Sequence, residues 1–163
     1  MVDDLELTKL AIRVGQRMQG ESRRLVTAES CTAGWLAKAI TDVVGSSAWF
    51  EAGYVVYSNA AKVRELGVPE KLLNEQGAVS EPAVSSMAQG ALTRSGADLA
   101  IAISGIAGPG GAVPGKPVGT VWFATASRRG VAVETIARVK FFKGDRELVR
   151  RKAVQFALRL ILT

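Results

Sequence analysis

The sequence predicts an α/β protein, a three-layer α/β/α sandwich on a mixed, mostly parallel β-sheet. Segments of strand character alternate with segments of helical character along much of the chain, as in parallel sheets. The run DLAIAIS (98–104) is apolar on both faces, which is typical of a strand covered by helices on both sides. Two long β-rich runs flank Arg128, Arg129 and Gly130, and this pattern indicates an antiparallel hairpin.

The first part of the chain is expected to form a helix and then a strand that turns directly into another helix. Apolar residues recur at helical spacing after an acidic first turn. The second helix is expected to end at Gly45, since glycine is common just past a helix. The predicted elements, in order, are helix 3–20, strand 24–28, helix 31–44, strand 54–58, helix 60–66 and helix 69–76, which a proline opens.

The second part is expected to contain the central strand and the antiparallel hairpin. A serine that can cap a helix, followed by glutamate and proline, predicts a helix despite Gly90 inside it. The final helix carries an apolar stripe with arginines opposite, which predicts a solvated basic face. The predicted elements are helix 80–95, central strand 98–104, hairpin strands 119–127 and 131–142, and helix 144–162.

Length and composition predict one compact domain over residues 1–163. Hydrophobic residues make up 48% and charged residues 22%, which excludes disordered and coiled-coil classes. A single cysteine allows no internal disulfide, and the acidic start lacks the basic region of a signal peptide, so a cytoplasmic protein is expected. Charges interrupt every apolar run before a bilayer-spanning length, so no membrane partner is expected.

The chain contains no histidine, and this narrows its chemistry. A Ser-His-Asp triad, a Cys-His pair and a histidine-bound zinc are all excluded, and one cysteine excludes thiolate metal clusters. No histidine-bound or thiolate-bound metal is therefore expected, and a general base must be Lys, Tyr, Asp or Glu. The formal net charge of +6 favours anionic partners, either nucleic acids or small phosphates.

The glycine-rich segment 104–117 imitates nucleotide-binding motifs without meeting their requirements. It contains a GxxxxGK pattern, but Pro117 stands where a phosphate loop needs Ser or Thr, and no helix follows. What remains is a flexible loop leaving a buried strand, where backbone N–H groups can approach a ligand. An ordinary glycine-rich surface loop is the alternative.

The segment TAESCTAG (27–34) places Ser30 where a strand turns into the predicted helix. There its hydroxyl would face the positive end of the helix dipole, which suits a nucleophile. A helix-capping role is the competing interpretation, because serine is common at that position. Cys31 is a second candidate nucleophile, although no imidazole can activate it.

A serine that reacts without histidine needs another base, and a buried neutral lysine is the usual solution. Lys62 follows a β-rich run and small residues, so its stem could enter a pocket, and Tyr57 could relay or hold a proton. A solvated helical lysine is the alternative for Lys62.

These residues and several further blocks resemble the C-terminal domain family of the competence-damage-inducible protein CinA. The resemblance implies an α/β/α fold. It also implies hydrolysis of the carboxamide of nicotinamide mononucleotide to nicotinate mononucleotide and ammonia, in pyridine nucleotide salvage, without metal or cofactor. The blocks that carry it are TAESCTAG (27–34), GSSAWFEAGYVVYSNAAK (45–62), GAVSEP (77–82), SGIAGPGG (104–111), KPVGTVWFA (116–124) and GDRELVRR (144–151).

Matched position by position, the resemblance implies Ser30 as nucleophile, Lys62 as base and Tyr57 as an orienting or proton-relaying partner. It further implies a small-molecule nucleotide substrate and a homo-oligomer. Arg146 is expected to bind the ribose phosphate, with a structural ion pair as its alternative. The remaining candidate substrate-binding positions are Cys31, Thr32, Gly45, Ser46 and Ser47, as backbone donors of an oxyanion hole, and Ser104, Gly105 and Ala107 in the loop.

Two points stay open at the level of sequence. Gly110, Ala112 and Val113 stand where the family often has acidic or hydroxyl residues, so polar side-chain contacts from these positions to a ligand are not expected. A non-catalytic nucleotide-binding or DNA-repair-associated module is the alternative function, and nucleic-acid binding would depend steeply on salt. The aromatic content of 6% and the solvated arginine face argue against a nucleic-acid partner.

Overall fold

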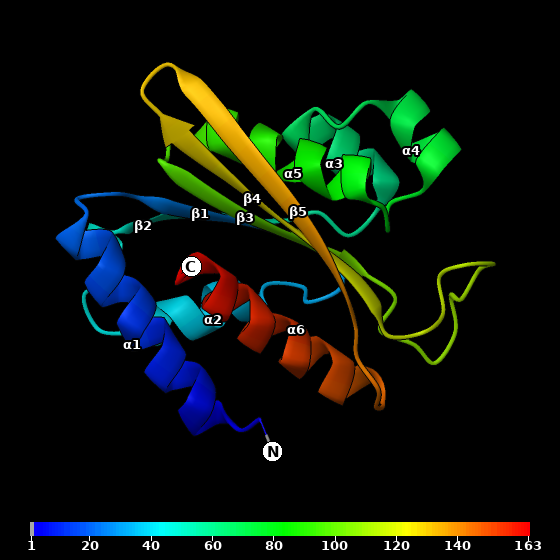
Figure 1. Cartoon of the computed structure of the whole chain (residues 1–163), viewed down its shortest axis with the longest axis horizontal. Coiled ribbons are helices and arrows are strands. Elements are labelled where there is room, and N and C mark those ends of the chain that lie inside the picture. The colour runs from blue at the N-terminus through cyan, green and yellow to red at the C-terminus, as the bar shows by residue number, and fades with distance from the viewer. Residues whose placement is uncertain (1) are drawn as a thin grey trace.

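The computed structural model describes residues 2–163, and Figure 1 shows one β-sheet between two layers of helices. The predicted α/β/α sandwich is therefore confirmed. The strands are β1 (Leu25–Glu29), β2 (Phe50–Val55), β3 (Leu99–Gly105), β4 (Thr120–Arg129) and β5 (Ala132–Phe141). The helices are α1 (Asp4–Gly20), α2 (Trp35–Thr41), α3 (Asn59–Leu66), α4 (Glu70–Gln76), α5 (Glu81–Ser95) and α6 (Arg146–Ile161), with the short 3₁₀ helix η1 (Ser46–Ala48).

The sheet has the strand order β2-β1-β3-β4-β5, so β3 is central, as predicted. β1 pairs in parallel with β2 and β3, whereas β4 is antiparallel to β3 and to β5. All strands except β4 thus run in one direction, which gives the mixed, mostly parallel sheet. Because Glu29 pairs with Val55 and with Ile103, β1, β2 and β3 end at the same edge. Open α/β sheets bind ligands at this edge.

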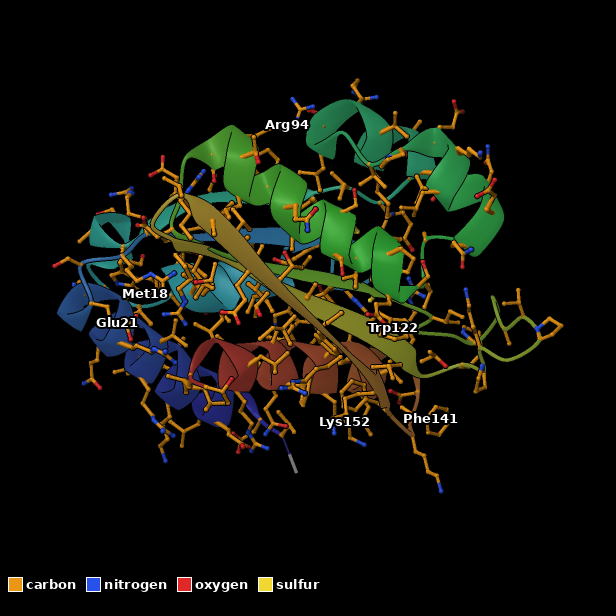
Figure 2. All side chains as sticks on the ribbon, turned by 45° about the horizontal axis from the view of Figure 1, so that its top comes forward. Met18, Glu21, Arg94, Trp122, Phe141 and Lys152 are labelled. Atoms are coloured by element: carbon orange, nitrogen blue, oxygen red, sulfur yellow. The ribbon has the colours of Figure 1, made fainter. Side chains whose placement is uncertain are left out.

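Each face of the sheet is covered by its own group of helices and its own apolar core. Helices α1, α2 and α6 cover one face, and α3, α4 and α5 lie on the other. Figure 2 shows the side chains that fill these layers, with the fully buried Met18 between α1 and the sheet. Gly90 lets α5 approach α3, because a Cβ at this position would lie 2.0 Å from the carbonyl oxygen of Leu66.

The prediction of a helix over 31–44 is wrong at its start. Residues Ser30 to Ala33 form a turn closed by the Ala33 amide on the Ser30 carbonyl, and α2 begins only at Trp35. Ala33 and Gly34 both have positive φ angles. A right-handed helix cannot include this left-handed conformation, so α2 cannot begin before Trp35. Ser30 and Cys31 are therefore not at the first turn of a helix.

The prediction of a strand over 54–58 is also displaced. β2 runs from Phe50 to Val55, because its register with β1 begins at the pair formed by Leu25 and Phe50. Residues 56–58 instead connect the end of β2 to α3. This connection brings Tyr57 and Lys62 to the edge of the sheet where β1 and β3 end.

The expected solvated face of α6 is present only in part: Arg146 and Arg159 are exposed, Arg150 and Arg151 are half-buried, and each of the four bonds to another part of the chain. Arg151 contacts Asp4 and Glu147, and Arg159 contacts Glu6. Arg150 donates to the turn that follows β1. Arg146 bonds to the loop after β3 and to Tyr57.

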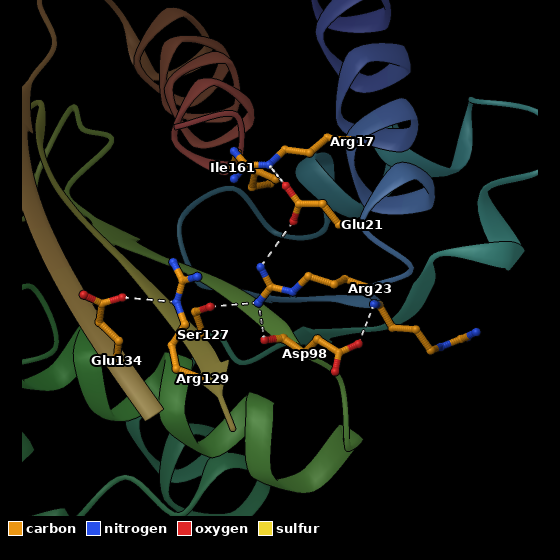
Figure 3. A network of polar contacts seen from close by, with 9 residues as sticks. Arg17, Glu21, Arg23, Asp98, Ser127, Arg129, Glu134 and Ile161 are labelled. Carbon is orange, nitrogen blue, oxygen red and sulfur yellow. Dashed lines mark hydrogen bonds and ion pairs between the residues drawn. The ribbon is translucent and has the colours of Figure 1, made fainter. Parts of the chain in front are cut away.

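A polar network joins α1 to β3 and β4 at the opposite edge of the sheet (Figure 3). Glu21 accepts from Arg17 at 2.8 Å and from Arg23 at 3.4 Å. Arg23 also donates to the Asp98 carbonyl at 2.8 Å and to the Ser127 hydroxyl at 2.7 Å. These contacts fix the segment that leads into β1. Within residues 2–163, none of the helices has the length and apolar composition that a bilayer crossing demands.

Candidate active site

A pocket of about 190 Å³ opens at the edge where β1 and β3 end. It is built from the turn after β1, the connection from β2 into α3, the loop before α5, the end of β3 and the start of α6. Its lining residues are Ser30, Cys31, Tyr57, Asn59, Lys62, Ala78, Val79, Ser104, Gly105, Ala107 and Arg146.

Ser30 and Lys62 meet at the bottom of this pocket. The Nζ atom of Lys62 lies 3.0 Å from the Oγ atom of Ser30 and donates to the carbonyl oxygens of Val56 at 2.9 Å and Tyr57 at 3.0 Å. Only 1% of Lys62 is exposed, so the alternative of a solvated helical lysine is wrong. The first turn of α3 and the end of β2 together hold the amine against the serine.

The surroundings of Lys62 favour a neutral amine. Burial lowers the pKa of Lys62, and the thiolate form of Cys31 would oppose this shift. Within residues 2–163, no carboxylate forms an ion pair with Lys62. In its neutral form the amine has two N–H donors for the two backbone carbonyls and a lone pair that can accept the proton of Ser30, whereas an ammonium would donate to all three oxygens. This arrangement suits a base that removes the serine proton.

Glu29 holds the turn that presents Ser30, and the sequence reasoning missed this role. Its buried carboxylate accepts four hydrogen bonds. Burial raises the pKa of the Glu29 carboxyl, and these bonds oppose that shift. The first turn of α2 is thus capped by Glu29 and not by Ser30, so the helix-capping alternative for Ser30 is wrong. The four donors are the Thr32 hydroxyl at 2.7 Å and the amides of Gly34 at 3.1 Å, Leu36 at 3.0 Å and Ala37 at 2.8 Å.

Cys31 also lines the pocket, but its thiol is poorly suited to attack. Burial raises the pKa of the Cys31 thiol to about 12, and the Glu29 carboxylate adds to this rise. The thiol is therefore protonated at neutral pH, while the amine of Lys62 contacts the neighbouring hydroxyl of Ser30.

Tyr57 and Arg146 lie together at the outer rim. Arg146 donates from Nη2 to the Tyr57 hydroxyl at 3.1 Å and from Nη1 to the carbonyl of Gly108 at 2.7 Å. Tyr57 contacts Lys62 through its backbone carbonyl, and its exposed hydroxyl faces Arg146. Within residues 2–163, Arg146 makes no ion pair, so the geometry does not support the alternative that Arg146 serves in a structural ion pair.

Only the first residues of the glycine-rich loop reach the pocket. Ser104 is 1% exposed and donates its hydroxyl proton to the Ala78 carbonyl at 2.7 Å, while Gly105 and Ala107 complete the wall. Residues 110–117 extend away from the sheet (Figure 1) and are absent from the pocket lining. In this part the loop is held by Lys116, which donates to the carbonyl of Gln76.

The structure does not bring Gly45, Ser46 and Ser47 to the pocket. This segment precedes β2, and the nearby Trp49 carbonyl accepts from the amide of Leu25, the first residue of β1. Ser30 follows the last residue of β1, so the length of a five-residue strand, about 16 Å, separates the two ends. Their expected place in an oxyanion hole is therefore not supported within one subunit.

Thr32 is fully buried behind the turn and is not part of the pocket lining. Its hydroxyl donates to Glu29, and its carbonyl accepts from Arg150. Asn59, Ala78 and Val79 line the pocket although sequence reasoning did not select them. For Asn59, the one available signal in the sequence was its position in the segment YSN, three residues before Lys62. No group of three potential metal ligands occurs among residues 2–163.

Comparisons with known proteins give a consistent picture. The family model described as CinA C-terminal domain matches residues 7–163. The nicotinamide-nucleotide amidohydrolase PncC of Escherichia coli (strain K12) is 54% identical over 97% of this chain and 94% of that protein. The protein of the same name from Pseudomonas putida is 53% identical over 93% of this chain and 92% of its own length. The crystal structure of the competence damage-inducible protein A (ComA) from Klebsiella pneumoniae superposes with a TM-score of 0.89 at 42% identity, covering 94% of this chain and 93% of that one. The chain belongs to the CinA C-terminal domain family.

Proposed function

We propose that this protein is an amidohydrolase that converts nicotinamide mononucleotide to nicotinate mononucleotide and ammonia through an acyl-enzyme on Ser30. One observation carries the proposal: a buried lysine amine lies 3.0 Å from a serine hydroxyl in the pocket where β1 and β3 end. The names of the relatives from Escherichia coli and Pseudomonas putida supply the substrate class.

In the first half-reaction, the neutral amine of Lys62 takes the proton from Ser30 as Oγ attacks the carboxamide carbon. The carbonyl oxygen becomes an oxyanion. When the tetrahedral intermediate collapses, the C–N bond breaks and the Lys62 ammonium protonates the leaving nitrogen. Ammonia departs, Lys62 is neutral again and the acyl group is esterified to Ser30.

In the second half-reaction, Lys62 takes a proton from water, and the resulting hydroxide attacks the ester carbonyl. The ester bond breaks, and the proton returns from Lys62 to Ser30 Oγ. The product is a carboxylic acid, which ionises at neutral pH. The net reaction consumes one amide and one water and yields one acid and one ammonia, so Lys62 acts alternately as base and acid.

The backbone N–H of Cys31, the residue after Ser30 in the pocket lining, is the proposed oxyanion donor. Within residues 2–163, the amide of Cys31 has no hydrogen-bond acceptor in another residue, whereas the Ala33 amide already bonds to the Ser30 carbonyl and Thr32 is fully buried outside the pocket lining. An N–H adjacent to the nucleophile that has no other partner is suited to stabilise the developing charge.

The size of the pocket determines how a nucleotide would lie. At about 190 Å³ it is smaller than the roughly 300 Å³ of sites that enclose a drug-sized ligand. The carboxamide end would therefore occupy the pocket, and the ribose phosphate would lie over the rim beside Arg146. There Tyr57 would orient the guanidinium through its hydroxyl, while its carbonyl orients the amine of Lys62. The Tyr57 hydroxyl contacts Arg146 and makes no hydrogen bond to Lys62, so the geometry does not support a proton-relay role for this hydroxyl.

We further propose that the protein acts in the cytoplasm in salvage of pyridine nucleotides, and that it is a homo-oligomer. Val55 and Tyr57 are 53% and 59% exposed on the edge strand β2 and next to the pocket. A second subunit could cover them and complete the exposed rim. Light scattering on a sizing column tests this assembly, and a strictly monomeric protein with full activity would exclude it.

The decisive experiment is to incubate the purified protein with nicotinamide mononucleotide and measure ammonia and nicotinate mononucleotide. We expect equimolar products from the wild type and none above background from Ser30→Ala. Binding of the nucleotide without ammonia release would instead support the non-catalytic module, and binding of DNA with a steep salt dependence would support its nucleic-acid version. Either result would overturn the amidase.

A further inference from the structure

Arg150 lies behind the turn that presents Ser30, outside the pocket lining. Its Nε donates to the carbonyl of Cys31 at 2.9 Å, and its Nη2 donates to the carbonyl of Thr32 at 3.1 Å. A guanidinium offers its donors in a rigid planar fork, so these two bonds fix two consecutive peptide groups together. Arg150 thus reaches the residues directly after Ser30 without reaching the substrate space.

The fork itself is held in place. Arg150 stands in α6, and its guanidinium carbon lies 5.4 Å from the ring centre of Trp35, the first residue of α2. The side chain is partly buried between these two helices. Its position is therefore set by two rigid elements.

Peptide planarity carries this constraint to the front of the turn. In a planar trans peptide the N–H and the carbonyl point in opposite directions, so the bond from Arg150 to the Thr32 carbonyl sets the orientation of the Ala33 N–H. The bond from Ala33 to the Ser30 carbonyl fixes the Cys31 N–H in the same way. A charged donor on a carbonyl also polarises the N–H of the same peptide.

We propose that Arg150 is a positioning residue of this site, which through the turn fixes and polarises the backbone N–H of Cys31, so that this N–H stabilises the oxyanion formed on attack by Ser30. This inference rests on the proposed amidase function. It assigns to Arg150 an effect on the rate of the chemical step and none on substrate affinity.

The test compares Arg150→Ala and Arg150→Lys with the control Arg151→Ala. Arg151 is the next residue of α6 and also lies over Trp35, with its guanidinium carbon 4.9 Å from the ring centre, but it bonds to Asp4 and Glu147 and not to the turn. With nicotinamide mononucleotide as substrate, we expect kcat to fall roughly 100-fold in Arg150→Ala, with KM within about threefold of wild type. Arg150→Lys should lose about tenfold, since one ammonium cannot reproduce the fork, and Arg151→Ala should keep kcat within about twofold.

A second readout does not depend on the identity of the substrate. The rate at which a fluorophosphonate labels Ser30, followed by intact-mass spectrometry, also requires stabilisation of an oxyanion, so it should fall in parallel with kcat in both Arg150 variants. If the wild type hydrolyses no nicotinamide mononucleotide, the proposed function fails, while the labelling rates still decide the role of Arg150.

Folding is checked by thermal melting of each variant, and Arg150→Lys replaces Arg150→Ala if the latter is unfolded at the assay temperature. Unchanged labelling and kcat in a folded Arg150 variant would overturn the proposal. An increase in KM at constant kcat would overturn it as well, because it would indicate contact with substrate. An equal loss in Arg151→Ala would reduce Arg150 to a general packing role.

Discussion

The amine of Lys62 and the hydroxyl of Ser30 lie 3.0 Å apart, although 32 positions separate them in the chain. Their proximity follows from the parallel pairing of β1 and β2, which end together at the pair formed by Glu29 and Val55. One residue past β1 stands Ser30, and a short connection past β2 leads into the helix that carries Lys62. The sheet therefore sets the distance between the proposed nucleophile and the proposed base.

Separate substitutions at Ser30 and Cys31 should distinguish the two candidate nucleophiles. We expect Ser30→Ala to lower kcat by at least about 10³-fold, because the attacking oxygen is removed. Cys31→Ser should retain activity within about tenfold, since the buried Cys31 thiol has its pKa raised to about 12 and is not the reacting group. Steady-state ammonia release measures both. The opposite ranking would assign the nucleophile to Cys31.

The pH dependence of kcat/KM should report the protonation of Lys62. Burial lowers the pKa of this lysine, and only its neutral form can accept the serine proton. Activity should therefore rise with pH and level off below pH 10.5, the ordinary value for lysine. Lys62→Arg should be inactive across this range, because a guanidinium stays protonated. A profile that keeps rising through pH 10.5 would contradict a lowered pKa.

The same shift predicts a pH-dependent cost to stability. Between the lowered folded-state pKa of Lys62 and 10.5, the unfolded chain binds more protons than the folded one, so the free energy of unfolding rises with pH in that window. Below the window the cost of burying the charge is fully present. Urea unfolding of wild type and Lys62→Met at pH 7 and pH 10 should show wild type gaining relative to the variant at the higher pH. A constant difference would contradict this linkage.

Glu29 is expected to be essential for the shape of the turn. In Glu29→Gln an amide NH₂ must face at least one of the groups that now donate to the carboxylate, so the free energy of unfolding should fall by about 2 kcal/mol. The displaced turn should also lower kcat.

The matched control is Glu21→Gln, which weakens the exposed ion pairs with Arg17 and Arg23 at the opposite edge (Figure 3) and should cost less than about 1 kcal/mol. Urea unfolding measures both variants. Equal losses would show that the burial of Glu29 has no special consequence.

Periodicity and composition predicted the layers, the central strand and the hairpin, because these depend on patterns that repeat over many residues. The start of α2 was missed, since Ala33 and Gly34 adopt positive φ angles that only Gly34 signals in sequence. The arginines of α6 were assigned to solvent, and their hydrogen bonds to distant segments were missed. Several of the acceptors are backbone carbonyls, whose positions cannot be predicted from a pattern of side chains.

In the candidate site, too, some residues were predicted from the sequence and others were not. Ser30, Lys62 and Arg146 were selected from residue chemistry and family resemblance, and the structure gathers them in one pocket. Gly45 to Ser47 were selected as backbone donors within a block that resembles the family, and strand direction places them at the other end of β1. The role of Glu29 depends on burial, which a sequence does not state for a single acidic residue.

Arg146 should determine affinity for the phosphate of the substrate. In Arg146→Ala the KM for nicotinamide mononucleotide should rise about 10- to 100-fold, as expected for the loss of one charge-assisted contact of about 1.5–3 kcal/mol. Nicotinamide riboside, which lacks the phosphate, should be hydrolysed poorly by wild type and variant alike, with similar KM values. Lys116→Ala is the control, because this lysine bonds to the Gln76 carbonyl and lies outside the pocket lining. If the substitution raised KM equally for both substrates, Arg146 would act by holding the loop through the Gly108 carbonyl and not by binding phosphate.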